Sequence, residues 1–242
     1  MTIQQTSLIL CAAVVLTACS GDDSNEPSPP MPSLMSPPMA TFEVAVTNLT
    51  ATQPLSPMTL AVASPDWSLF ELAEPASVAL ELIAESGDNS ALLAELGGNA
   101  QVMESISGTG VVMPGMTATF EISVPESDLD QASLSAVTML VNTNDALTAV
   151  RGVALDAIEL GGSVRQSMAA YDAGTESNSE LAATIPGPAA GGEGFNAERD
   201  DSDRILVHPG VVGVLGGRAD SVLDEEHRFD NPVAGIVITR IE

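Results

Sequence analysis

The sequence predicts an all-β protein, an antiparallel β-sandwich with one or two short helices. Several short segments alternate apolar and polar residues or are rich in β-branched residues, and turn residues separate them. Only the region around residues 76–96 shows helical spacing. Apolar residues make up 45% of the 242 residues, which is enough for a substantial hydrophobic core. Strands in series with a single helical excursion favour a sandwich.

The strands follow from two kinds of pattern. Alternation of apolar and polar residues predicts a half-buried strand, and a continuous apolar run such as SLSAVTMLV predicts one that is buried on both faces. Long loops, notably 173–204, fill the remainder. Strands are expected at residues 41–47, 117–124, 133–141, 205–207, 211–215 and 233–241.

Two short helices are expected between the first strands. Residues 76–86 place Val78, Leu82 and Ile83 on one face, and a glycine follows them directly. A second helix is expected over 90–96, where another pair of glycines ends it. Aromatic residues are only 3% of the chain, so the core must consist mainly of valine, leucine, isoleucine, methionine and alanine.

The charge of the chain excludes some kinds of partner. Acidic residues number 33 against 7 basic ones, a formal net charge of −26, and all seven basic residues are arginines. Phosphate contacts need lysine or arginine, so we expect no nucleic-acid binding and no direct docking on an anionic membrane. The charge favours metal cations or basic partners.

The first eighteen residues have the features of a signal peptide. The twelve-residue apolar run 7–18 is too short to span a bilayer and runs into Leu16-Thr17-Ala18-Cys19, which resembles the bacterial lipobox. We therefore expect lipidation at Cys19 and, because no aspartate follows it, an outer-membrane lipoprotein. A secretory signal without lipid is the alternative, and it would leave the protein periplasmic or secreted.

Residues 19–40 are expected to form a linker between this anchor and the folded domain. They contain six of the sixteen prolines, and such segments stay extended. The domain itself is expected over 41–242. We expect the domain to associate with the membrane only through the lipid at Cys19.

Six segments of this domain together resemble the spondin domain, the module found in F-spondin and mindin, in its bacterial form. The most specific are AEPAS with AESGD, MLVNTNDA and YDAGTE. The resemblance implies a sandwich similar to calcium-dependent lipid-binding domains, with a calcium ion held by loops at one end. In animals the module belongs to adhesive proteins of the extracellular matrix. The segments are 46–57, 69–93, 133–150, 169–180, 205–211 and 232–241.

The resemblance also implies which residues bind calcium. Asp145 takes the place of the first carboxylate of the family, Asp172 matches the second directly, and Glu176 stands where the family has an aspartate. Oxygen ligands of this kind suit calcium, and Gly174 between the last two permits a tight turn. The alternative is that Asp172 caps a turn while Asp145 and Glu176 are solvated.

Two other acidic segments are also candidates for binding a cation. Residues 64–67, SPDW, spell the animal motif at a different place in the chain, and their order and flanks indicate that the match at Asp66 is a coincidence. The cluster 198–203 is expected to be a solvated loop, with a second, weak cation site as the alternative.

Three functions remain open from the sequence. The first is a non-catalytic binding or adhesion module of the cell envelope that carries calcium and binds an envelope or extracellular-matrix component. The second is a secreted hydrolase that uses His208 or His227 with a carboxylate, although no Gly-x-Ser-x-Gly motif is present. The third is a purely structural envelope protein. We expect the first, and therefore no enzyme.

Overall fold

The computed structural model describes residues 37–242 and is mostly antiparallel β-sheet. The expectations about residues 1–18, Cys19 and most of the linker lie outside the described residues. Each helix in the described part is too short or too polar to cross a bilayer. The strands are β1 (Met39–Asn48), β2 (Thr59–Ala63), β3 (Val102–Ser107), β4 (Thr117–Pro125), β5 (Ser133–Met139), β6 (Ala146–Ala154), β7 (Ser163–Asp172), β8 (Leu206–Val207) and β9 (Ala234–Arg240).

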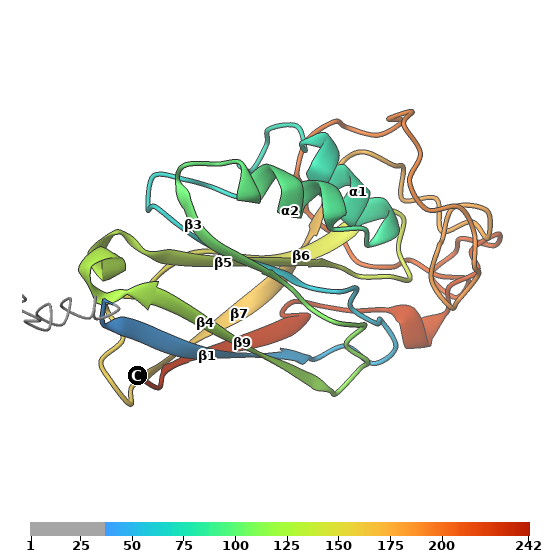
Figure 1. Cartoon of the computed structure of the whole chain (residues 1–242). Helices are drawn as coiled ribbons and strands as arrows, with labels where there is room; N and C mark the ends of the chain where they lie inside the picture. Colours follow the sequence, from blue (N-terminus) through green and yellow to red (C-terminus); the bar gives the residue numbers. More distant parts are fainter. Residues whose placement is uncertain (1–36) are drawn as a thin grey trace, which may run out of the picture. The chain divides into compact units, whose positions relative to one another are not determined.

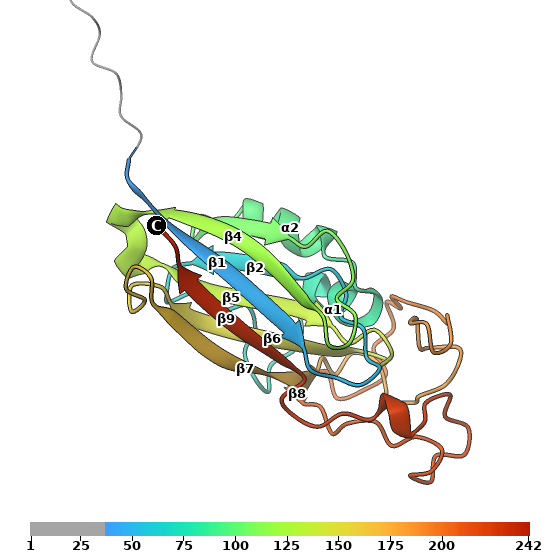
Figure 2. The same cartoon turned by 90° about the horizontal axis from the view of Figure 1, so that it is seen from below.

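The strands run in the order β3-β2-β5-β6-β7-β9-β1-β4, and each neighbouring pair is antiparallel. Strand β7 belongs to both layers, because Ser163–Met168 pair with β9 and Ala169–Asp172 pair with β6. The short β8 adds to the end of β7. The predicted all-β class is therefore confirmed, and Figures 1 and 2 show the two layers lying face to face.

The core between the layers has the composition that the scarcity of aromatic residues requires. Along β1, the fully buried Phe42, Val44 and Val46 alternate with more exposed residues, as one half-buried strand should. The neighbouring strand β9 contributes Ile236, and the opposite layer contributes aliphatic side chains such as Leu134. This cluster connects both layers and fixes the sandwich.

A second core lies between the outer face of one layer and the two helices, α1 (Val78–Ser86) and α2 (Ser90–Gly97), as Figure 1 shows. The Ser77 hydroxyl caps α1 by accepting the N–H of Leu80 at 3.2 Å. The expected buried face is wrong in part, because Leu80 and Ile83 are buried and Val78 is 60% exposed. Ala79 and Ala84, which lie beside Leu80 and Ile83, complete the buried face. These alanines were not assigned to it from the sequence.

The strands expected at 41–47, 117–124, 133–141 and 233–241 are confirmed to within two residues. The strand expected at 211–215 is wrong. The backbone N–H groups of Val212 and Gly213 donate to the buried carboxylate of Glu180 at 2.6 and 2.9 Å, so they make no sheet ladder. Two short 3₁₀ helices, η1 (Glu126–Gln131) and η2 (Glu225–His227), complete the fold.

The long loops gather at one end of the sandwich. Residues 173–205 and 208–233 lie at this end, whereas β1 begins and the chain ends at the opposite one (Figures 1 and 2). The expected loop 173–204 is therefore confirmed, and it covers the end at which β6 begins and β7 stops.

Candidate metal centre

Sheet pairing brings the predicted calcium ligands together. Ala146 at the start of β6 pairs with Asp172 at the end of β7, so Asp145 lies directly beside that strand end. The carbonyl oxygen of Asp145 accepts the N–H of Ala173 at 3.2 Å. The loop that follows β7 then returns Glu176 to the same place, since its N–H donates to the Asp145 carboxylate at 3.2 Å.

Asp145 is fully buried, and its two carboxylate oxygens differ sharply. Oδ2 accepts the N–H of Thr175 at 2.8 Å as well as that of Glu176. Oδ1 is buried and has no hydrogen-bond partner within residues 37–242. Burial, followed by the charge of Asp172, raises the pKa of Asp145 to about 7, against the opposing effect of the two N–H donors. An unpartnered buried oxygen of this kind is rare, and a water molecule or a cation can satisfy it.

Asp172 is buried and forms the Asx turn that the alternative interpretation expected. Its Oδ1 accepts the N–H of Gly174 at 2.8 Å, and its Oδ2 accepts the side-chain amide of Asn178. Burial raises the pKa of Asp172 in spite of these two donors. Each carboxylate oxygen has two lone pairs, so these bonds leave acceptor capacity for a cation.

The loop after β7 passes so close to Arg204 that only glycine fits at position 174. The φ of Gly174 is +70°, and an added Cβ would lie 2.4 Å from the carbonyl oxygen of Arg204. The N–H of Asp203 also donates to the Gly174 carbonyl at 2.8 Å. These contacts hold the segment 200–204 against the Asp172 loop.

This packing adds a carboxylate that the sequence analysis did not choose. Burial and the charge of Asp172 raise the pKa of Asp201, which places the two groups within electrostatic reach. Asp201 belongs to the acidic cluster 198–203, which was interpreted as a solvated loop. Asp201 is itself exposed, as a residue of a solvated loop should be, and its charge is felt at Asp172 because the loop packs against the turn at Gly174.

Glu176 is mostly buried and also has a free oxygen. Its Oε2 lacks a hydrogen-bond partner within the described chain. Burial, followed by the charge of Glu85, raises the pKa of Glu176 to about 8, and the Asn144 side chain opposes this rise. The alternative interpretation, in which Asp145 and Glu176 are solvated, is therefore wrong, because they are 0% and 8% exposed.

These residues fit a hard divalent cation in their chemistry. They offer carboxylate oxygens, two of which lack partners, and loop carbonyls lie beside them. Within residues 37–242, however, no three histidine, cysteine, aspartate or glutamate side chains already stand close enough to hold a metal ion. Calcium binding therefore requires the carboxylates to move toward one another, with backbone oxygens or water completing the shell.

The two histidines have structural contacts. The Nδ1 atom of the buried His208 accepts the N–H of Gly210 at 2.9 Å, so its Nε2 carries the proton and donates to Asn178 Oδ1 at 2.9 Å. Burial lowers the pKa of His208 to about 4. His208 thus orients the amide that holds Asp172. His227 pairs with Asp224 at 2.8 Å in the capping box of η2.

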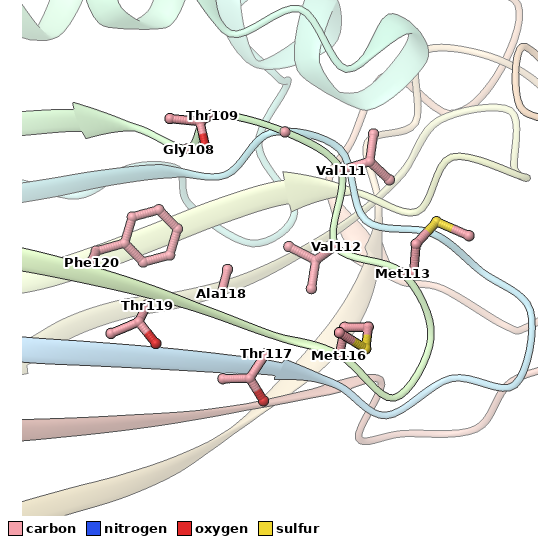
Figure 3. Close-up of a pocket in the computed structure, with 11 residues that line it drawn as sticks. Gly108, Thr109, Val111, Val112, Met113, Met116, Thr117, Ala118, Thr119 and Phe120 are labelled. Atoms are coloured by element: carbon pink, nitrogen blue, oxygen red, sulfur yellow. The ribbon is translucent and has the colours of Figure 1, made fainter.

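Two remaining features lie apart from these carboxylates. Asp66 is exposed and occupies a turn after β2. A hollow of about 360 Å³ is lined by residues 108–113 and 116–120, which belong to the connection between β3 and β4 and to the start of β4. It has no charged side chain in its lining. Figure 3 shows Met113 and Met116 on either side of the turn in this connection.

No protein-family model matches the chain, and no curated protein matches it. The functional argument therefore depends on the residues and contacts described above.

Proposed function

We propose that the chain is a non-catalytic binding module of the bacterial cell envelope, a spondin-type domain in which calcium orders the loops at one end. One observation carries this proposal: Asp145, which adjoins the strand end that bears Asp172, and Glu176 each bury a carboxylate oxygen that has no hydrogen-bond partner within residues 37–242. A buried carboxylate is costly unless a cation or donors compensate it. A calcium ion would supply this compensation for all three residues.

The ion would act as a cross-link between loops. Asp145 precedes β6, and Asp172 and Glu176 flank the turn that follows β7. An ion bound by these three carboxylates would fix the beginning of loop 173–204 and, through Asp201, its end. Removal of the ion would leave like charges facing one another, so the loop end would loosen first.

Lipidation at Cys19 would attach the domain to the membrane through the linker. Within the domain, β1 begins at the end opposite to the acidic loops, so the linker would join the domain at the end away from those loops. An envelope or extracellular-matrix component bound at those loops would meet a calcium-ordered surface. Mass spectrometry of the envelope fraction should find a blocked, lipid-bearing N-terminus, and a wild-type chain that starts beyond Cys19 would contradict the anchor.

Thermal unfolding with calcium and with chelator tests the calcium site. At a hundredfold excess over the dissociation constant, calcium should stabilise the fold by about 2.7 kcal/mol. For a domain of this size that is a rise of about 5–10 °C in Tm, at roughly 2–4 °C per kcal/mol. Magnesium should do less, because it requires a tighter octahedron. Coincident melts with calcium and with chelator would refute the site.

Two aspartate variants make this test specific. Asp172→Asn should remove most of the calcium effect. It should leave the metal-free protein slightly less stable, because the relief of repulsion is more than offset by the loss of one of the two acceptors that bind Gly174 and Asn178. Asp66→Asn is the matched control, an exposed aspartate with the same change of charge, and should leave the calcium effect unchanged. The reverse result would show that the wrong loop was assigned.

The binding role is tested by comparing envelope and matrix components retained by the tagged protein with and without chelator. Retention that depends on calcium and is lost in Asp172→Asn supports a binding module, whereas no specific retention favours a purely structural protein. A screen of esterase and peptidase substrates covers the hydrolase hypothesis. Activity that disappears in His208→Ala would overturn the proposed function.

A further inference from the structure

Strand β4 is an exposed edge of the sheet. It comes last in the strand order, and its one strand neighbour in the described part of the chain is β1. The N–H of Ser123 points away from β1, because it donates to the Glu104 carboxylate at 3.0 Å. Alternate N–H groups of an antiparallel strand face opposite sides. Those of Thr117, Thr119 and Glu121 therefore also point away from β1, and no strand in the described chain pairs with them.

The two edges of the sheet are protected to different degrees. The other edge strand, β3, is six residues long, its register with β2 shifts between Val62 and Ala63, and helix α2 packs against it. Strand β4 is nine residues long, pairs with β1 without a register shift and has no proline before its last residue. Short strands, bulges, prolines, lysines and covering elements are the usual means of blocking an edge. On β4 only the Glu104 carboxylate serves this purpose, and it covers Ser123 alone.

The hollow of about 360 Å³ lies along the unprotected part of this edge. Four consecutive β4 residues, 117–120, line it together with the connection that follows β3. Phe120 points across it toward Gly108, whose added Cβ would lie 3.4 Å from the Phe120 ring, whereas Thr117 and Thr119 point to the other side of β4 (Figure 3). The large apolar side chains that are exposed in its lining are those of Val111, Met113 and Met116. A strand added to this edge would turn every second side chain toward Phe120.

The charges around this edge favour a cationic partner. Glu43 of β1 lies directly opposite Glu121 in the β1–β4 register, and both side chains are exposed. Like charges in directly opposite positions destabilise a sheet. The chain has no basic residue before Arg151, and neither glutamate forms an ion pair within residues 37–242. A lysine or arginine on an added strand would supply the opposite charge that β1 and β4 lack.

Two other occupants fit this edge less well. Pairing of β4 with the β4 strand of a second copy would add further glutamates to an edge that already carries Glu43 and Glu121, and it would bring no cation. The linker 19–40 contains six prolines, which have no N–H to donate to a neighbouring strand.

We propose that β4 and the hollow beside it bind an extended, cationic peptide segment of a partner protein, which adds to the sheet as a further strand. Main-chain hydrogen bonds to Thr117, Thr119 and Glu121 would hold the segment, and its alternate side chains would give specificity. Apolar side chains would enter the hollow beside Phe120, and basic ones would lie beside Glu121. None of the hollow's lining residues belongs to the metal centre, so this surface is additional to the calcium-ordered loops and should bind without calcium.

The test uses the full chain in chelator and a short peptide in which lysine alternates with valine. Fluorescence anisotropy gives the dissociation constant, and amide hydrogen exchange followed by NMR locates the peptide. The N–H groups of Thr117, Thr119 and Glu121 should exchange rapidly in the free protein and slowly with the peptide. Those of Ala118 and Phe120 should exchange slowly in both, because they face β1.

Substitutions separate main-chain pairing from charge. Thr119→Pro removes an N–H that β1 does not use and should weaken the peptide roughly tenfold, the effect of one lost main-chain hydrogen bond. Glu121→Gln should weaken it roughly threefold. Glu95→Gln, at an exposed glutamate of α2, is the matched control and should bind as the wild type does. A peptide methylated at alternate backbone nitrogens should lose its affinity for the wild type, which tests pairing without any change in the protein.

The outcomes distinguish this surface from the metal centre. A lysine peptide that does not bind, or a glutamate-valine peptide that binds equally well, overturns the cationic strand and leaves the calcium site standing. Binding that is lost in chelator places the peptide at the calcium-ordered loops and also overturns it. Slow exchange of Thr119 and Glu121 in the free chain would show that a second copy or the linker already covers the edge, which contradicts the proposal; sedimentation tells these two apart.

Discussion

Raising the pH should destabilise the protein when calcium is absent. Burial and the charge of Glu85 raise the pKa of Glu176 to about 8 in the folded chain, against its ordinary value of 4.5. Between these values the folded chain holds a proton that the unfolded chain has lost, so the free energy of unfolding falls as the pH rises. Calcium would keep Glu176 ionised in the folded protein and remove this trend.

The magnitude is best measured between pH 6.5 and 8. Below this range His208 titrates in the unfolded chain but not in the folded one, because burial lowers its pKa from 6.5 to about 4. The contribution of the buried, neutral His208 to the free energy of unfolding is therefore lost as the pH falls through that lower range. This change would mask the effect of Glu176. Between pH 6.5 and 8, Glu176 alone should lower the free energy of unfolding by about 1.6 kcal/mol, at about 1.4 kcal/mol per pKa unit.

The assay is urea unfolding at several pH values across this range, in chelator and in calcium. The wild type should lose stability with pH in chelator, with Asp145 adding to the loss, and should be nearly flat in calcium. Glu176→Gln should reduce the slope in chelator, since the amide does not titrate. A free energy of unfolding that is constant or rises with pH in chelator would refute the burial of ionisable carboxylates at this site.

Three further substitutions test the surrounding structure. Gly174→Ala should lower the free energy of unfolding by about 1–3 kcal/mol and should also lower the calcium affinity, because φ at this position is +70° and the added Cβ would strike Arg204. Unchanged melts and calcium titrations would contradict this. Arg199→Lys should cost about 1–3 kcal/mol in urea unfolding, because lysine lacks the fork whose two nitrogens reach the buried Glu81 and Asp203 separately; a neutral result would show that this pairing is unimportant. Leu147→Ala should cost about 2–5 kcal/mol, since this fully buried side chain packs between the sheet and α1; a loss below 1 kcal/mol would mean that the site collapses to fill the space.

The elements that the sequence predicts well are those in which local pattern and tertiary environment agree. Residues 41–47 alternate because β1 has one face in the core, and residues 133–141 are continuously apolar because β5 is covered on one face by the opposite layer and on the other by the helices. The strands β2, β3, β6 and β7 were not expected. Strand β2 is only five residues long, and most of β3 and β7 is only partly buried, so neither gives a clear alternation.

The candidate site was predictable only in part, for a similar reason. The positions of Asp145 and Asp172 follow from a resemblance and from strand ends, and sheet pairing does bring them together. Glu85 and Asp201 join the same region through the packing of α1 and of loop 173–204, which leaves no local mark in the sequence. The strand expected at 211–215 failed because Glu180, far away in sequence, takes its N–H groups.

The most direct test of the central claim is a crystal structure grown with calcium, with the ion located by its anomalous scattering. The account predicts an anomalous peak at the loop end, about 2.3–2.6 Å from carboxylate oxygens of Asp145, Asp172 and Glu176. The currently unpartnered Oδ1 of Asp145 should be among the ligands. A calcium-soaked crystal with no peak there, or with its only peak at Asp66, would contradict the account.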